Sequence, residues 1–310
     1  MKVRASYGLV GSDVAAGNRY LYDQVYQKGD GYSFGDYPKL TDSYKEGDLG
    51  TPNATWEKAK KFDVGLDMNF LNKFSFTIDY FLDKRYDQLV TREYIPLVIG
   101  IGFSPNNIAR TTNQGFDGQI SYQDRFGDFD FNTNLVFSYA KNRVDYKAEA
   151  QQKYPWLAAT GKPLNQPFGY KWIGYYTPED VAKIRSGASD APAAPYTDIP
   201  VQAGDLKYAD LNNDGTIDDY DKSAIGKPNL PSTTLGWSFG GYWRGFSFNV
   251  LFQGSFDYSF AINGTGIESF KSQFQPIHTS RWTLERYQNG EEIGFPRLTT
   301  NPSTINSCLL

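Results

Sequence analysis

An acidic stretch in the second half of the sequence carries the side chains best suited to bind a metal ion. If Asp210 is position 1 of a loop, oxygen-bearing residues fall at positions 1, 3, 5, 7, 9 and 12, and Gly215 falls at position 6. This is the spacing of an EF-hand-type calcium loop, in which glycine permits the sharp turn and position 7 contributes its backbone carbonyl. Ile217, at position 8, would be the buried apolar residue of the loop. The predicted calcium ligands are Asp210, Asn212, Asp214, Thr216, Asp218 and Asp221.

The loop departs from the standard pattern at its last position. Asp221 stands where the EF-hand has glutamate, as in dockerin-like loops, and its shorter arm weakens bidentate binding. The alternative interpretation is an acidic turn in which Asn and Asp side chains only cap backbone groups. Calcium is favoured because five oxygen side chains and the glycine coincide with the pattern. Upstream, Glu179 and Asp180 follow Pro178 and are predicted to begin a short helix and not to bind metal.

Other chemistries find little support in the residues. The chain has a single histidine, His278, and a single cysteine, Cys308, which can neither form an internal disulfide nor complete a metal cage. A glycosidase pair could be hidden among the 35 acidic residues, but no Gly-x-Ser-x-Gly, His-Glu-x-x-His or phosphate-binding glycine loop is present. With a net charge of -4 and no cluster of Lys and Arg, nucleic acid is not an expected partner. We therefore predict that the protein is not an enzyme.

The elements that must position these residues are long amphipathic strands. Phe74, Phe76 and Ile78 alternate with Ser75 and Thr77, so one face of that strand is apolar and the other polar. The same alternation recurs along the chain. Strands are expected at residues 1–10, 55–70, 73–90, 113–125, 129–143, 233–243 and 246–258.

The connections between these strands are alternately long and short. Long loops at 11–54, 91–112 and 144–232 alternate with tight turns at 71–72, 126–128 and 244–245. Barrels of the outer membrane have short periplasmic turns and long extracellular loops, and soluble sandwiches rarely contain an unstructured loop of such length. Aromatic residues make up 16% of the chain although mean hydropathy is -0.54, which suits a barrel wall in which every second residue faces lipid. The predicted fold is an all-β, partial antiparallel transmembrane β-barrel with long extracellular loops.

The two ends suggest a piece of a longer protein. Residues 2–7 lead directly into a strand without a secretory signal, and residues 306–310 lie in a polar segment with no closing strand. We therefore expect residues 1–310 to be part of one barrel domain that is incomplete at both ends. Residues 144–232 are expected to form one long extracellular loop that contains the calcium-type loop.

Several segments resemble the SusC/RagA family of TonB-dependent outer-membrane transporters, found in Bacteroidetes-type bacteria. The matching segments are 2–8, 53–67 with its Asn-x-x-Trp-Glu motif, 76–81, 113–118, 169–174 and 204–226, the last being the most specific. The resemblance implies a 22-stranded barrel around an N-terminal plug, of which this chain supplies about seven strands. It also implies energy-coupled import of oligosaccharides or peptides across the cell outer membrane, a SusD-like surface lipoprotein as partner, and TonB contact through the missing N-terminal part.

Substrate would be bound by the long loops, where the candidate contact residues are Trp156, Trp172, Tyr175 and Tyr176. A second hypothesis is a secreted, soluble β-protein that binds carbohydrate and is braced by calcium. This second hypothesis predicts a globular protein that is soluble without detergent.

Overall fold

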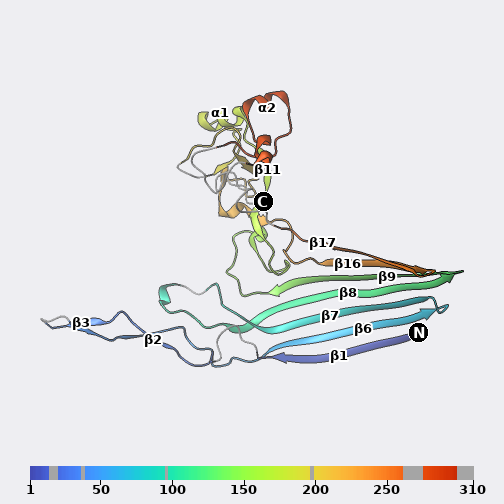
Figure 1. Cartoon of the computed structure of the whole chain (residues 1–310). Coiled ribbons are helices and arrows are strands. Elements are labelled where there is room, and N and C mark those ends of the chain that lie inside the picture. Colours follow the sequence, from blue (N-terminus) through green and yellow to red (C-terminus); the bar gives the residue numbers. More distant parts are fainter. Residues whose placement is uncertain (14–19, 36–38, 95–96, 196–198, 261–274, 299–310) are drawn as a thin grey trace. The chain divides into compact units, whose positions relative to one another are not determined.

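The computed structural model describes residues 1–13, 20–35, 39–94, 97–195, 199–260 and 275–298 (Figure 1). Cys308 and the polar C-terminal segment lie outside the described residues. The described chain forms two compact units. The first comprises residues 1–152, 158–165 and 230–258, and the second comprises 153–157, 166–229 and 259–310.

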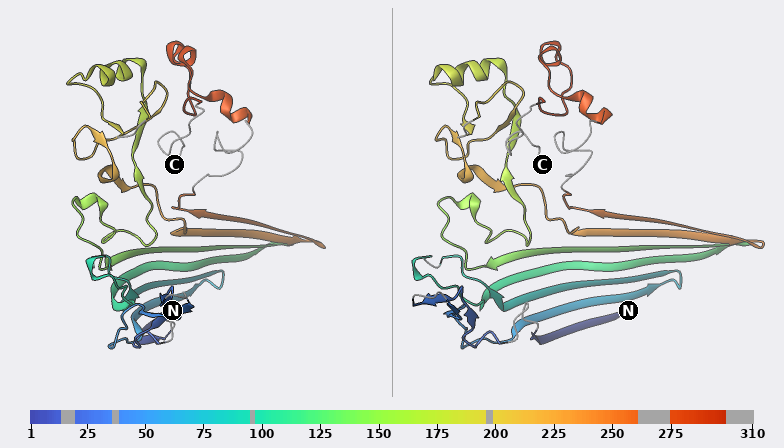
Figure 2. Two further views of the ribbon diagram at one scale, coloured as in Figure 1. Left: turned by 90° about the vertical axis from the view of Figure 1, so that its left-hand side faces the viewer. Right: turned by 60° about the vertical axis from the view of Figure 1, so that its left-hand side comes forward.

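The first unit is built on one antiparallel sheet of seven strands in the order β1-β6-β7-β8-β9-β16-β17. Each strand pairs with the next long strand along the chain, so the sheet is a simple meander, visible as one layer in Figures 1 and 2. Its strands are β1 (Lys2–Ser12), β6 (Glu57–Phe70), β7 (Phe74–Val90), β8 (Asn106–Phe126), β9 (Phe129–Tyr146), β16 (Thr233–Trp243) and β17 (Phe246–Phe256). The predicted all-β antiparallel fold is confirmed.

One strand begins earlier than the sequence predicts. β8 starts at Asn106 instead of residue 113, which shortens the second long loop. The stretch from Asn106 to Thr112 is polar and shows no alternation, but its backbone pairs with β7 and β9. The alternation of apolar and polar residues therefore did not predict the start of a strand that extends beyond the apolar part of the sheet.

The pairing register keeps apolar side chains on one face of the sheet. One cross-strand row runs Val64, Tyr80, Phe116 and Tyr139 through β6, β7, β8 and β9. Many side chains on this face are accessible: Phe116 is 48% exposed, and others along the described strands are similarly exposed. A soluble protein would bury such a face, so the sheet fits a wall with lipid on one side.

The opposite face carries charge, and its central ion pairs cross three strands. Arg4 on β1 donates from Nε and Nη2 to the carboxylate of Asp67 on β6, at 2.8 and 3.1 Å, and Nη2 also donates to Asp79 on β7 at 2.9 Å. Asp79 can lean toward Arg4 because the intervening residue on β6 is Gly65, where a Cβ atom would collide with the Asp79 carboxylate. Glycine at this position therefore permits the ion-pair network.

The short turns have the backbone conformations that tight hairpins require. Leu71 and Asn72 have φ of 54° and 53°, and Arg244 and Gly245 have φ of 44° and 97°. Positive φ at two successive residues gives a turn whose twist matches that of the flanking strands. Arg244 also pairs with Asp128 of the neighbouring turn at 2.8 Å, which ties two adjacent hairpins together.

The long loops contain short elements of their own. In the loop after β1 these are β2 (Tyr26–Lys28), β3 (Tyr32–Phe34), β4 (Lys39–Thr41) and β5 (Tyr44–Glu46), and the next loop contains η1 (Leu97–Ile99). The loop after β9 contains η2 (Pro155–Leu157), β10 (Phe168–Tyr170), β11 (Trp172–Tyr175), α1 (Pro178–Ser186), β12 (Ala194–Pro195), β13 (Leu206–Tyr208), β14 (Thr216–Ile217), η3 (Asp219–Asp221) and β15 (Lys222–Ala224). After β17 come η4 (Pro276–Ser280) and α2 (Leu284–Asn289). Among the described residues no helix is long and apolar enough to cross a membrane.

The assignment of faces can be tested with two neighbouring residues of β17 in the full-length protein. Val250 pairs with Phe239 on the apolar face, and Asn249 pairs with Gly240 on the other face. A charged side chain on a lipid-facing position costs roughly 2–4 kcal/mol at the bilayer midplane. Val250→Arg should therefore impair barrel assembly, measured by heat-modifiable migration in gels, whereas Asn249→Arg should assemble normally. Equal effects of the two substitutions would contradict the register.

Candidate functional site

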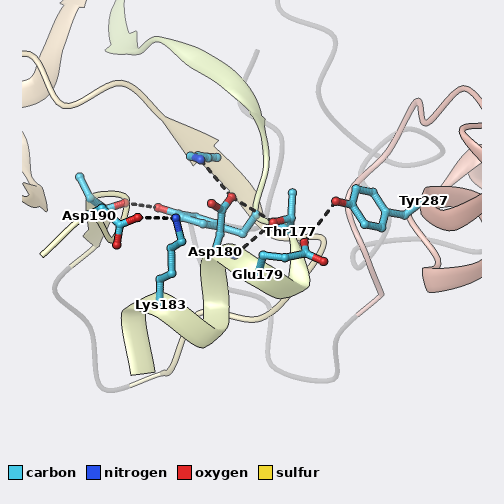
Figure 3. Close-up of polar contacts among 9 residues, drawn as sticks. Thr177, Glu179, Asp180, Lys183, Asp190 and Tyr287 are labelled. Atoms are coloured by element: carbon cyan, nitrogen blue, oxygen red, sulfur yellow. Dashed lines mark hydrogen bonds and ion pairs between the residues drawn. The ribbon is translucent and has the colours of Figure 1, made fainter. Parts of the chain in front are cut away.

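The second unit has its own framework, which begins at helix α1. Thr177 is the N-cap: its side chain accepts a hydrogen bond from the Asp180 amide, and the Asp180 carboxylate accepts one from the Thr177 amide. Figure 3 shows this capping box, together with the Lys183–Asp190 ion pair and the hydrogen bond from Tyr287 to Glu179. The predicted helix start is thus confirmed, and both acids serve structure. Partial burial opposes the charged form of Asp180, but hydrogen bonds from Lys207 and Thr177 outweigh it and lower its pKa.

Tyr176 is the central side chain of this unit. It is completely buried, and its hydroxyl donates to the Ala193 carbonyl at 2.6 Å. Burial raises the pKa of Tyr176. Here the structure corrects the sequence prediction of a substrate contact, because a ring without exposed surface offers no platform to a ligand. Tyr175 and Tyr176 are adjacent in the sequence, and nothing in the sequence indicates which of the two side chains is buried.

A buried ion pair connects the segment after β17 with the middle of the long loop. Arg297 donates from Nε to Asp205 at 2.6 Å, and Asp205 is only 4% exposed. Asp205 also accepts a hydrogen bond from the Gln202 amide at 2.8 Å. Next to this pair, Gly204 has φ of +91°, and a Cβ atom there would collide with the Trp282 ring. Two segments far apart in sequence therefore share one polar core contact.

The calcium-type loop folds as a series of side-chain-capped turns. Asp210 accepts from the Asn213 and Gly215 amides at 2.6 and 2.8 Å, and Asp214 accepts from the Thr216 amide at 2.9 Å. Gly215 has φ of +83°, as the sharp turn requires, and Ile217 is buried.

The other predicted ligands of the loop are bonded in the same way. The amide oxygen of Asn212 accepts from the Asp214 amide, and the Asp218 carboxylate accepts from the Tyr220 amide. Asp221 is fully buried and accepts from the Leu211 and Asp218 amides.

These contacts bear on both interpretations of the loop. Its side chains cap backbone amides, as the alternative interpretation expected. In the described part of the chain, no three His, Cys, Asp or Glu side chains form a group that could hold a metal ion. The donors are nevertheless all oxygens, which calcium prefers, and a carboxylate oxygen that accepts one hydrogen bond has a second lone pair. Calcium binding therefore remains a proposal.

The remaining candidate aromatics lie in two clusters. Trp156 stacks on Tyr154 with ring centroids 4.6 Å apart and donates from its indole to the Tyr220 carbonyl at 2.7 Å. Because Tyr220 belongs to the calcium-type loop, Trp156 braces that loop. Trp172 lies edge-to-face against Tyr175, with centroids 5.5 Å apart, and is 45% exposed. Of the four candidate aromatic residues, only Trp172 is exposed.

Asn107 is a structurally important residue that the sequence interpretation missed. Its side chain accepts from the Thr55 amide at 2.9 Å and donates to the carbonyls of Thr55 and Asp87, both at 2.8 Å. Glu57 of the Asn-x-x-Trp-Glu segment accepts from the Leu89 amide at 3.0 Å. Together these bonds join the end of the first long loop to an irregularity in β7 between Arg85 and Gln88. In the sequence, the Asn-x-x-Trp-Glu motif indicated that Glu57 is important, but no pattern indicated a role for Asn107.

Comparison with known proteins identifies the sheet. Residues 2–251 match the family described as TonB dependent receptor-like, beta-barrel. The chain belongs to the TonB-dependent receptor β-barrel family. TonB-dependent receptors P3 and P26 of Formosa agariphila are 28% and 24% identical to it, over 67% and 79% of the chain. The chain spans about a fifth of their length, 21% and 23%.

Solved structures show the same fold. The RagAB peptide importer in the open-open state superposes with a TM-score of 0.68 at 16% identity and covers 97% of this chain, which corresponds to 31% of the solved chain. A second RagAB peptide transporter structure gives 0.67 at 18% identity over the same shares. As part of a TonB-dependent receptor, the sheet lies in the outer membrane, and the soluble alternative is set aside.

The Arg297–Asp205 pair makes a testable prediction for the full-length receptor. Arg297→Ala leaves a buried carboxylate without its cation, which typically costs about 3–5 kcal/mol. Proteolytic cleavage within residues 199–229 should therefore accelerate strongly. Arg286→Ala is the matched control, since its pair with Glu291 is partly exposed, at 32% and 45%, and solvent-exposed pairs contribute about 0–1 kcal/mol. Equal protection of the two variants would show that the buried pair does not hold the unit together.

Proposed function

We propose that this chain is part of an outer-membrane importer that takes up oligosaccharides or peptides with TonB-coupled energy, together with a SusD-like surface lipoprotein. The observation that carries the proposal is the seven-stranded meander with one predominantly apolar face, in a chain of the TonB-dependent receptor family. The likeness to RagAB structures, which are named as peptide importers, supports peptides as one substrate class.

Within this proposal, the second unit is the substrate-facing part of the chain. It contains the exposed Trp172, which packs against the half-buried Tyr175, and the neighbouring Ile173 is 52% exposed. Large apolar side chains exposed outside the membrane-spanning strands are typical of binding surfaces. Aromatic rings stack on sugar rings and pack against peptide side chains, so this pair suits either class of substrate.

Uptake assays with the full-length receptor can test both the proposed substrate class and the role of Trp172. Cells that carry the receptor should accumulate labelled members of one class, oligosaccharides or peptides, in a manner that depends on TonB. Trp172→Ala should raise the half-saturating concentration of that substrate several-fold, while Trp172→Phe, which keeps an aromatic ring, should recover most of the affinity. If deletion of the receptor gene changes the uptake of neither class, the proposed function is wrong.

We also propose that residues 210–221 bind calcium as a structural ion. The candidate ligands are Asp210, Asn212, Asp214, Thr216, Asp218 and Asp221. Four carboxylates in one short loop repel each other, and a hard divalent cation would neutralise them. Calcium would cross-link the side chains of the loop. Trp156 and the buried Ile217 hold the loop against the rest of the unit. Extracellular sites of this kind bind with affinities on the order of 0.1–1 mM.

Limited proteolysis of the full-length receptor distinguishes a calcium loop from a solvated acidic turn. Chelation and Asp214→Ala should each increase cleavage within residues 210–221. Asp214→Asn keeps an acceptor for the Thr216 amide but removes the charge, so it should shift protection to higher calcium concentration. Asp219→Ala is the control, because Asp219 occupies no ligand position and its side chain is 85% exposed. A cleavage pattern that neither chelation nor the Asp214 variants alter would contradict calcium binding.

A further inference from the structure

The apolar face of the sheet ends in a row of cations on the side of the long loops. The row Phe62–Leu82 lies at the outer end of the apolar part, and the next row on the same face is Lys60–Lys84. Pairing continues this row through Thr112 on β8 to Arg143 on β9. The basic belt, as we call it, comprises Lys58, Lys60, Lys84, Lys141 and Arg143, all on the face that carries Phe62, Leu82 and Tyr139.

The belt lacks enough carboxylates to balance its charge. Asp87 pairs with Lys58 at 2.9 Å, and Asp145 pairs with Arg143 at 2.7 Å. Lys60, Lys84 and Lys141 make no ion pair with any described residue, although Lys60 lies 5.4 Å from the Tyr86 ring centroid. All three lysines are exposed. Five cations against two acids leave a net charge of +3 on this part of a chain whose total charge is -4.

Lys60 and Lys84 are direct cross-strand partners, which makes their charges costly for the sheet. Side chains at paired positions lie about 5 Å apart, and like charges there destabilise the pairing. Since no described residue provides a counter-ion to either lysine, a ligand that brings negative charge would stabilise both strands.

The position of the belt points to the source of that charge. From Phe70 to Phe62 the apolar face of β6 advances by eight residues, about 26 Å along the strand. At the tilt of roughly 35–45° of such strands this is about 20 Å in height, within the roughly 25 Å apolar band of outer-membrane barrels. Lys60 is one row beyond Phe62, about 5 Å further in height, and therefore lies at the edge of this band. That is where lipid headgroups begin, and lysine stems can lie along the apolar surface while the ammonium groups reach the headgroups. Tyr86 pairs with Lys58 in the next row outward, and aromatic residues are typical of membrane interfaces.

We propose that the basic belt binds the phosphate groups of lipid headgroups in the outer leaflet. Lys60, Lys84 and Lys141 would contact phosphate directly, and Thr112 and Arg143 extend the site along the row. The belt uses the lipid face of the barrel wall, so this inference depends on the place of the sheet in the membrane and not on which substrate is imported.

Lipid binding by the purified full-length receptor tests the proposal. In native mass spectrometry the receptor should retain phosphatidic acid in preference to phosphatidylcholine. Each lysine removed should lower the affinity for phosphatidic acid roughly five-fold, so Lys60→Gln/Lys84→Gln should lose most of the preference. Lys60→Arg/Lys84→Arg should retain it, since charge is conserved. Heat-modifiable migration of each variant shows that the barrel is assembled.

Neighbouring Lys61 provides the matched control. It lies on β6 next to Lys60 but pairs with Asp83 on the opposite face, so Lys61→Gln changes the same net charge without touching the belt. Equal loss of lipid in Lys60→Gln and Lys61→Gln, or unchanged binding in the double variant, would overturn the proposal. Inorganic phosphate that displaces the lipid at equal concentration would identify a free-anion site and overturn the assignment to headgroups. Substrate uptake by the double variant at saturating substrate should remain unchanged, which separates this test from that of the importer.

Discussion

The rest of the structure depends on the unbroken backbone pairing of the seven long strands. In lipid there is no water to bond an exposed amide or carbonyl, so a membrane-spanning strand must find its partners in neighbouring strands. Pairing from β1 to β17 satisfies this requirement for the interior strands, with irregularities confined to the outer ends of β7 and β8. Because side chains alternate along each strand, a common register assigns every residue of the wall to lipid or to the opposite face.

The face of the sheet opposite the lipid-facing side carries charged residues. Arg4, Asp67 and Asp79 connect β1, β6 and β7, and the space above Gly65 lets the Asp79 carboxylate lie across the middle strand. One oxygen of Asp79 and one of Asp83 are buried without a hydrogen-bond partner among the described residues. Such groups are costly in isolation and are ordinarily satisfied by water or by neighbouring protein. The chain represents about a fifth of the length of its curated relatives, so neighbouring protein is a natural source of donors.

The second unit is stabilised in a different way from the sheet. It has short strands, two capped helices and a small core around Tyr176, Leu206 and Ile217. Much of its order comes from side chains that bond to backbone: the Thr177 cap, the turns of residues 210–221, and the Trp156 indole on the Tyr220 carbonyl. Buried ion pairing between Asp205 and Arg297 adds a link between segments that are distant in sequence. A loop built in this way can present aromatic side chains in a defined arrangement, which a structureless loop could not.

The sequence by itself determined the seven long strands apart from the early start of β8, and with them their faces and the short turns. A period of two is a local property, and a lipid-facing strand must repeat it over its whole length, so Phe74, Phe76 and Ile78 reveal their face without any tertiary information. The helix start at Pro178 and the glycine of the 210–221 turn were also readable, because caps and positive φ depend on neighbouring residues only. Family resemblance supplied the outer-membrane assignment, which the comparisons confirm.

Only the tertiary structure decided which loop residues are buried, which pair, and which lysines share a row. Tyr175 and Tyr176 are adjacent and alike in sequence, yet only Tyr176 is fully enclosed, because the fold of the surrounding segments determines its burial. Asn107 gained its role from Thr55 and Asp87, which lie far away in sequence, and Asp205 gained its cation from Arg297. The basic belt likewise exists only through register: Lys60 and Lys84 become neighbours when β6 and β7 pair, and no local pattern in either strand contains that information.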